Sequence, residues 1–154
     1  METKKLGRQT VRFSDPPAIV GYGSVAGSKE GRGPLGHCFD LTSRDDRFHQ
    51  ESWEKAETTM QKKALSFALN KAGLTTEQLD YVLAGDLLNQ CIATSYSMRT
   101  QEIPFFGLYG ACSTMAEGLS LGAILIDGGF ASYTAALTSS HFCSAERQYR
   151  NPLE

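Results

Sequence analysis

Cys112 is the residue whose position in the sequence suggests chemistry most directly. It follows the apolar run Pro104–Tyr109, which predicts a strand, and it precedes small and apolar residues that predict a helix from Thr114. A residue at such a junction lies beside the first N–H groups of the helix, which lack partners and carry the positive end of the dipole. The position favours a reactive thiolate and also attracts anions, so two uses are open.

A catalytic triad around Cys112 is the first use to test. Asp127 and His141 follow it in the order that many hydrolases use, and Gly110–Thr114 resembles a nucleophile elbow. Helix geometry excludes this triad, because Asp127 at the far end of the same helix would lie roughly 22 Å away. A thiolate without a triad remains possible, as does a small buried cysteine with no chemical role.

Further polar residues are predicted at the same edge of a sheet. Asp86 and Asn89 follow the second predicted strand, and His141 follows the fourth. Open α/β sheets bind ligands at the carboxyl ends of their strands, so these residues are expected near Cys112. The candidate ligand-binding residues are Cys112, Ser113, Thr114, Asn89 and His141. The other cysteines and histidines lack the spacing of metal ligands, so neither a metal site nor a cofactor is predicted.

The elements that must position these residues are read from the hydrophobic pattern. Strands and helices alternate along the chain, which predicts an α/β fold with a mostly parallel sheet and helices on both faces. The match of Gly21, Gly23 and Ala26 to a dinucleotide fingerprint is discounted, because later glycines prevent the helix it requires. Strands are expected over 18–23, 81–84, 104–109 and 133–138, and helices over 52–72, 92–101 and 114–127.

The helix headed by Cys112 is predicted to be buried at the centre of the molecule. Between Ile103 and Ala145 the only charged residues are Glu117 and Asp127, whereas ten lie between Arg44 and Lys63. A helix that is apolar all round needs a covering layer on each side. About four strands are available, so we expect the second layer to come from another copy of the chain, as a homodimer, or from a segment outside it.

Composition narrows the class of protein. The 154 residues carry a net charge of −2, from 15 Lys and Arg against 17 Asp and Glu, so nucleic-acid binding is not expected. Four cysteines without C-x-x-C spacing and the lack of a signal sequence predict an intracellular protein with reduced thiols. No apolar run reaches the roughly 20 residues of a transmembrane helix, so any membrane association would be peripheral.

Several blocks of sequence together resemble the stage V sporulation protein AD family, which has a thiolase-like fold. They are Gly33–His37, Ala84–Gln90, Gly110–Thr114, Ile126–Ala131, Thr138–His141 and Ala145–Gln148. The resemblance implies two similar halves stacked in five layers, with the cysteine-bearing helix in the middle. Residues 1–154 would then be the N-terminal thiolase-like domain, and the second half would be absent from this chain.

The resemblance also implies a function. The family is expected to bind dipicolinic acid (pyridine-2,6-dicarboxylic acid) with calcium, for uptake into the developing spore and release at germination. It also implies that the protein acts together with other stage V sporulation A membrane proteins and is peripherally associated with the spore inner membrane. The alternative is a thiolase-like or ketoacyl-synthase-like acyltransferase with Cys112 as nucleophile. Thr114 and Met115 stand where such enzymes often have Gly, and the partner His belongs to the second half, so we expect no acyl transfer by this chain alone.

Overall fold

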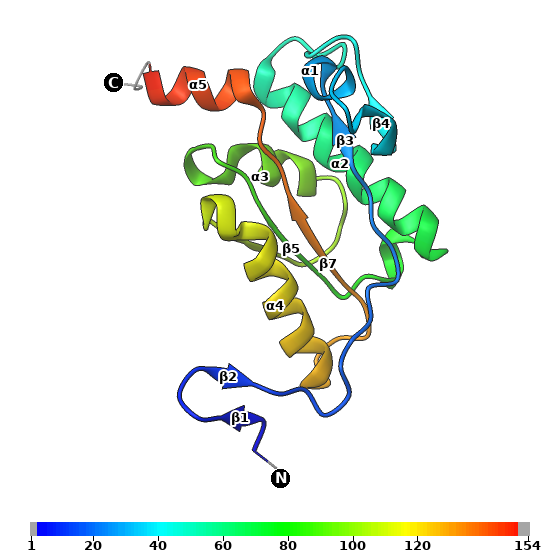
Figure 1. Ribbon diagram of the computed structural model, residues 1–154, viewed down its shortest axis with the longest axis vertical. Helices are drawn as coiled ribbons and strands as arrows, with labels where there is room; N and C mark the ends of the chain where they lie inside the picture. Colours follow the sequence, from blue (N-terminus) through cyan, green and yellow to red (C-terminus); the bar gives the residue numbers. More distant parts are fainter. Residues whose placement is uncertain (1–2, 151–154) are drawn as a thin grey trace.

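A three-stranded parallel sheet forms the centre of the computed structural model, which describes residues 3–150. The central strand β5 (Tyr81–Gly85) lies between β6 (Phe105–Gly107) and β7 (Thr134–Thr138). Val82 pairs with Phe105 on one side, and Tyr81 pairs with Thr134 on the other. The predicted α/β fold with a parallel sheet is confirmed, and Figure 1 shows β5 and β7 running side by side.

Helices cover both faces of this sheet, as predicted. Helix α2 (Trp53–Ala72) and helix α3 (Ile92–Met98) pack on one face, against a core that includes Val82 and Ala84 of β5. Helix α4 (Thr114–Asp127) packs on the other face (Figure 1). Alternate residues of a strand point to opposite faces, so Leu83 and Gly85 face α4.

Helix α2 has the predicted boundaries, but its buried face differs from the prediction. The Ser52 side chain accepts a hydrogen bond from the Lys55 N–H at the start, and Gly73 ends the helix with a φ of 66°. Apolar residues spaced by three and four along this helix predict an inward face that includes Trp53 and Met60, but both are only half-buried. The fully buried side includes two polar residues, and its members are Ala56, Glu57, Gln61, Leu65 and Leu69.

Helix α4 approaches the sheet through glycines. A Cβ on Gly118 would lie 3.2 Å from Cβ of Ala136, and one on Gly122 would lie 2.6 Å from Oγ1 of Thr134. Other sides of the helix expose large apolar side chains, namely Met115, Leu119, Leu121 and Ile124. The described part of the chain therefore supplies one covering layer for this helix and not two, as expected from its few strands, and the origin of the second layer stays a prediction.

The first predicted strand, over 18–23, is not formed. Residues 16–24 are extended without regular structure and run beside α2, where a Cβ on Gly21 or Gly23 would overlap the backbone carbonyl oxygens of Ala68 or Ala64. A groove of about 490 Å³ separates this segment from β7. A strand needs a hydrogen-bonded neighbour, and this segment is separated from the free edge of β7 by the groove, so the two do not pair.

Three other segments differ from the prediction. Strand β6 is shorter than 104–109 and lies at an edge of the sheet, so Phe105 and Phe106 are exposed although a buried strand was predicted. The helix predicted over 92–101 ends at Met98. The segment over 24–50, where neither a strand nor a helix was predicted, contains the short elements β3 (Val25–Ala26), α1 (Ser28–Gly31), η1 (Gly36–Cys38) and β4 (Leu41–Thr42).

The two ends of the described chain are both structured. A hairpin of β1 (Lys5–Leu6) and β2 (Thr10–Val11) is tied to the end of α4, because Lys4 Nζ lies 2.5 Å from Oδ2 of Asp127. Helix α5 (Phe142–Arg150), which the sequence analysis did not predict, lies beyond the end of β7 (Figure 1). Among residues 3–150 there is no helix with the length and apolar character needed to cross a bilayer.

Candidate functional site

Cys112 lies where β6 turns into α4, as the sequence predicted. It is the middle residue of a short 3-10 helix, η4 (Ala111–Ser113), and its side chain is exposed. Ala111 has a φ of 49°, in the left-handed region that non-glycine residues seldom adopt. Strained backbone of this kind tends to occur at functional sites, where the surrounding structure holds it in place.

The side chains that follow Cys112 leave the start of α4 uncapped. The Ser113 hydroxyl donates a hydrogen bond to the Gly110 carbonyl at 2.7 Å, and Thr114 Oγ1 accepts one from the Gly110 N–H at 3.2 Å. No side chain accepts a hydrogen bond from the first N–H groups of η4 or α4. The backbone of η4 takes up the first N–H groups instead, since Ser113 donates to the Gly110 carbonyl at 3.0 Å and Thr114 donates to the Ala111 carbonyl. The N–H groups left without a side-chain cap beside Cys112 are those at the start of η4.

Asn89 lies on a neighbouring loop, at the carboxyl end of β5. It begins the 3-10 helix η3 (Asn89–Cys91), in which Gln90 and Cys91 both have left-handed φ values, of 56° and 51°. The Asn89 N–H donates to Oε1 of Gln148 at 2.8 Å, which fixes this loop to α5. The exposed Asn89 side chain makes no hydrogen bond within the described chain, so its amide is available to a ligand.

Several contacts bring the Asn89 loop next to the β6–α4 junction. The Cys91 thiol donates to the Leu108 carbonyl at 3.3 Å, and the Tyr109 and Tyr149 hydroxyls donate to the Leu87 carbonyl at 3.5 and 3.0 Å. Burial raises the pKa of the Cys91 thiol, so this cysteine stays protonated. The loop after β5, the segment before Cys112 and α5 thus form one continuous surface.

His141 occupies a different environment. It is buried at the end of β7, and its ring lies 5.3 Å from the Trp53 ring. The Cys143 N–H donates to Nδ1, so Nε2 carries the proton and donates to the Asp46 carbonyl at 2.7 Å. Neither ring nitrogen is free for a ligand in this conformation. Among the described residues no hydrogen bond joins Cys112 to Asn89 or His141, so their shared site stays a prediction.

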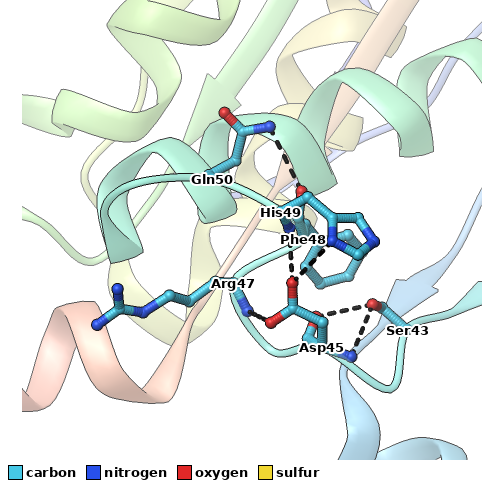
Figure 2. A network of polar contacts seen from close by, with 6 residues as sticks. All are labelled: Ser43, Asp45, Arg47, Phe48, His49 and Gln50. Carbon is cyan, nitrogen blue, oxygen red and sulfur yellow. Dashed lines mark hydrogen bonds and ion pairs between the residues drawn. The ribbon is translucent and has the colours of Figure 1, made fainter.

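A compact loop over 43–50 provides the Asp46 carbonyl that accepts the His141 hydrogen bond. Figure 2 shows the polar contacts within this loop. Oδ1 and Oδ2 of Asp45 accept hydrogen bonds from the backbone N–H groups of Arg47 and His49, at 3.0 and 2.8 Å. The hydrogen bond from His49 has the largest effect on Asp45, followed by the one from Arg47, and both lower its pKa and keep it ionised. The loop is thereby fixed by its own side chains, with Asp46 presented to the His141 ring.

A buried polar network behind the sheet edge was missed by the sequence analysis. At its centre, Gln61 of α2 donates through Nε2 to the hydroxyls of Thr94 and Ser139, at 3.0 and 2.8 Å. These hydroxyls in turn donate to carboxylates, Thr94 to Asp86 Oδ2 and Ser139 to Glu57 Oε1, each at 2.6 Å. The network joins the carboxyl ends of β5 and β7, which carry the candidate site.

One feature of the sequence could have revealed this network. Glu57 and Gln61 lie on the same helix face as the buried Leu65 and Leu69, because the four residues follow one another at every fourth position. Read with that spacing, Glu57 and Gln61 are polar residues on a buried face, and such residues are hydrogen-bonded in folded proteins. Burial is the largest influence on Glu57 and raises its pKa, against hydrogen bonds with Ser139, Ser144 and the His141 backbone that lower it.

The fold defines the class of protein. A parallel sheet with helices on both faces is thiolase-like, and solved β-ketosynthases share this fold. The solved priming β-ketosynthase of the R1128 polyketide pathway matches 94% of this chain and 48% of its own, at a TM-score of 0.58 and 16% identity. A 3-oxoacyl-[acyl-carrier-protein] synthase III from Aquifex aeolicus matches 58% of this chain and 31% of its own, at a TM-score of 0.49 and 22% identity.

The family is shown by sequence. The model of the family described as stage V sporulation protein AD matches residues 7–154. Stage V sporulation protein AD of Bacillus subtilis is 45% identical over 151 residues, which cover 98% of this chain. The chain belongs to the stage V sporulation protein AD family. It spans 45% of the length of that curated relative.

Proposed function

We propose that this chain is part of a non-enzymatic protein that binds dipicolinic acid as its calcium chelate, for uptake into the developing spore and release at germination. The observation that supports this most is the junction before α4, where the start of η4 has no side-chain cap and Cys112 is exposed. An anion fits such a position because the N–H groups and the helix dipole both favour negative charge. Family membership supplies the sporulation context.

The chemistry of dipicolinate suits the residues around this helix start. A flat aromatic dianion needs N–H donors for its carboxylates and an apolar surface for its ring. The N–H groups of Ser113 and Thr114 already donate to the Gly110 and Ala111 carbonyls. The Cys112 N–H would therefore serve one carboxylate, and the free Asn89 amide would serve the other. The ring of Tyr109 is exposed on the same surface and offers a face on which the pyridine can stack.

Calcium fits because the site already holds a negative charge. Oε2 of Glu117 would lie 2.7 Å from a Cβ on Gly110, so this carboxylate stands beside the helix start. A free dianion would be repelled there, whereas a chelated cation turns the contact into an attraction. Among residues 3–150 no three His, Cys, Asp or Glu cluster as a metal site, so in this proposal the ligand brings the cation with it.

The remaining parts of the proposal follow from the family and from the bare face of α4. The protein would act with other stage V sporulation A membrane proteins, peripheral to the spore inner membrane. The exposed apolar residues of α4 would be covered by the remainder of a full-length family member or by a second copy. His141, whose ring is engaged by the chain itself, would contribute by shaping the sheet edge.

The test is a titration of calcium dipicolinate, followed by calorimetry, with the variant Cys112→Trp. It uses this chain and a chimera that joins it to the remaining part of the Bacillus subtilis relative. We expect saturable binding that the indole of Cys112→Trp weakens at least about tenfold, by filling the space before the helix start. Cys38→Trp, at another exposed cysteine, is the control and should bind as the parent does.

Two results would contradict the proposal. One is the lack of any saturable heat in the chimera, and the other is full affinity in Cys112→Trp. Dipicolinate without calcium should bind more weakly than the chelate, because it meets Glu117 uncompensated.

Acyl transfer is the second candidate function, and the strained Ala111 before an exposed Cys112 favours it. In this reaction the Cys112 thiolate attacks the thioester carbonyl of acetyl-CoA, coenzyme A leaves as the thiol, and an acetyl thioester forms on Sγ. We expect no such adduct, since both His141 ring nitrogens are engaged and no other base contacts Cys112 in the described chain. Mass spectrometry after incubation decides, and an acetyl group on Cys112 would establish the enzymatic function.

A further inference from the structure

The hydroxyl oxygen of Ser144 lies close to two other oxygen atoms, but the hydroxyl has only one proton to donate. Its Oγ lies 2.6 Å from Oε2 of Glu57 and 2.9 Å from the carbonyl oxygen of His141. A carbonyl oxygen cannot donate, so the hydroxyl proton of Ser144 must lie on the His141 side if that contact is a hydrogen bond. The contact with Glu57 then needs a proton from Glu57.

The other oxygen of Glu57 cannot carry that proton. Oε1 lies 2.6 Å from the Ser139 hydroxyl, which receives a hydrogen bond from Gln61 Nε2. The Thr94 hydroxyl donates to Asp86 and so must accept from Gln61, which turns Nε2 toward both hydroxyls and leaves Gln61 Oε1 without a partner among the described residues. Ser139 must therefore donate to Oε1, and Oε2 is the position left for an acidic proton.

We propose that Glu57 is a positioning residue that works as a neutral carboxylic acid, in which Oε2–H donates to Ser144 and the Ser144 hydroxyl donates to the His141 carbonyl. With Glu57 ionised, Ser144 would have to donate to the carboxylate, and two oxygens would face each other at 2.9 Å without a proton. The neutral acid makes every short contact in this cluster a hydrogen bond.

The charges around Glu57 agree with a neutral acid. Its side chain is almost fully buried, and no Lys or Arg pairs with it among the described residues. The basic groups nearby on α5 and the 43–50 loop are used elsewhere, since Arg147 pairs with Glu54 and Arg47 lies over the Trp53 ring. From the β5 side the group that faces Glu57 is Asp86, and its negative charge also raises the pKa of Glu57.

Asp86 is the other carboxyl group of this network, and it acts as an acceptor. Its two oxygens accept three hydrogen bonds, from the N–H groups of Leu88 and Thr94 and from the Thr94 hydroxyl, at 2.9, 2.8 and 2.6 Å. Glu57 differs from it because Ser144, beside Oε2, needs a donor once its own proton goes to the His141 carbonyl. The network thus runs from an acceptor at β5 to a donor at β7.

The consequence concerns the connection between β7 and α5. The His141 carbonyl also accepts the Ala145 N–H at 3.1 Å, the first hydrogen bond of α5, and the His141 ring is held by the Cys143 N–H. A proton on Glu57 therefore secures both the start of α5 and the placement of His141. Ionisation of Glu57 would withdraw the Ser144 proton from the His141 carbonyl and loosen this connection.

The experiment follows Glu57 in this chain without any ligand, so it does not depend on the proposed function. Carbon-13 NMR of labelled glutamate carboxyls should show Glu57 protonated at pH 6, and the assignment comes from loss of its signal in Glu57→Gln. Hydrogen exchange at the Ala145 and Cys143 amides reports the connection itself. Glu57→Gln keeps a donor for Ser144 and an acceptor for Ser139, so both amides should stay as protected as in the parent.

Glu57→Ala removes the donor, and the two amides should exchange about tenfold faster. In the parent the protection should fall as pH rises through the pKa of Glu57, whereas in Glu57→Gln it should not change with pH. Glu54→Ala, which breaks the surface pair on the same helix, is the control and should leave both amides protected. An ionised Glu57 at pH 6, or a Gln variant that exchanges as fast as the Ala variant, would overturn the proposal. If Glu57→Ala does not fold, the carboxyl titration and the Gln variant still decide.

Discussion

Gly85→Ala is expected to lower the free energy of unfolding by about 3 kcal/mol, at the upper end of what overpacking in a core usually costs. The new Cβ would overlap the Leu108 carbonyl oxygen and lie 2.8 Å from Cγ2 of Thr114. Neither neighbour can move easily, because Leu108 is backbone and Thr114 is buried at the start of α4. Strand β5 is also paired on both sides, so it cannot shift away.

The matched control is Gly107→Ala, on the neighbouring strand. There a new Cβ would meet only Cε2 of Phe105, at 3.8 Å, which is an ordinary contact. Urea unfolding followed by circular dichroism gives the free energy of unfolding for both variants. Equal stability of the two would show that the β5–α4 contact beneath the candidate site is looser than described.

Asp86→Ala is expected to cost a similar amount, about 3 kcal/mol, because it orphans buried donors. The carboxylate accepts two backbone N–H groups, of Leu88 and Thr94, and the Thr94 hydroxyl. The hydroxyl can turn toward another acceptor, but the N–H groups cannot, and each unpaired buried donor costs about 1–3 kcal/mol. The loop that carries Asn89 should loosen at the same time.

Urea unfolding again measures this loss, with Asp15→Ala as the control. Asp15 is exposed and its carboxylate makes no hydrogen bond within the described chain, so the change should stay within about 0.5 kcal/mol. If Asp86→Ala and Asp15→Ala were equally stable, water would be replacing the lost acceptor and the network would not be dry. Faster hydrogen exchange at the Leu88 and Thr94 amides would identify the donors that lost their partner.

Much of the fold could be predicted because the local sequence determines where its helices begin and end. Helix α2 follows from its apolar spacing and its Gly73 end, and α4 follows from small apolar residues that end at Asp127. The position of Cys112 at a strand–helix junction is local too, and it is confirmed. Such features depend on residues within a few turns of each other, so a single sequence determines them.

The features that only the tertiary structure decided depend on distant partners. Segment 18–23 has the residues of a strand but no neighbour at pairing distance, and β6 is apolar yet lies at an edge. Ser139 and Ser144 bond Glu57 from 82 and 87 residues away, and His141 bonds Asp46 from 95. The spacing of residues along the chain does not predict contacts between residues that are so far apart in sequence. The proton that we assign to Glu57 can therefore be inferred only from the folded structure, in which these oxygens lie close together.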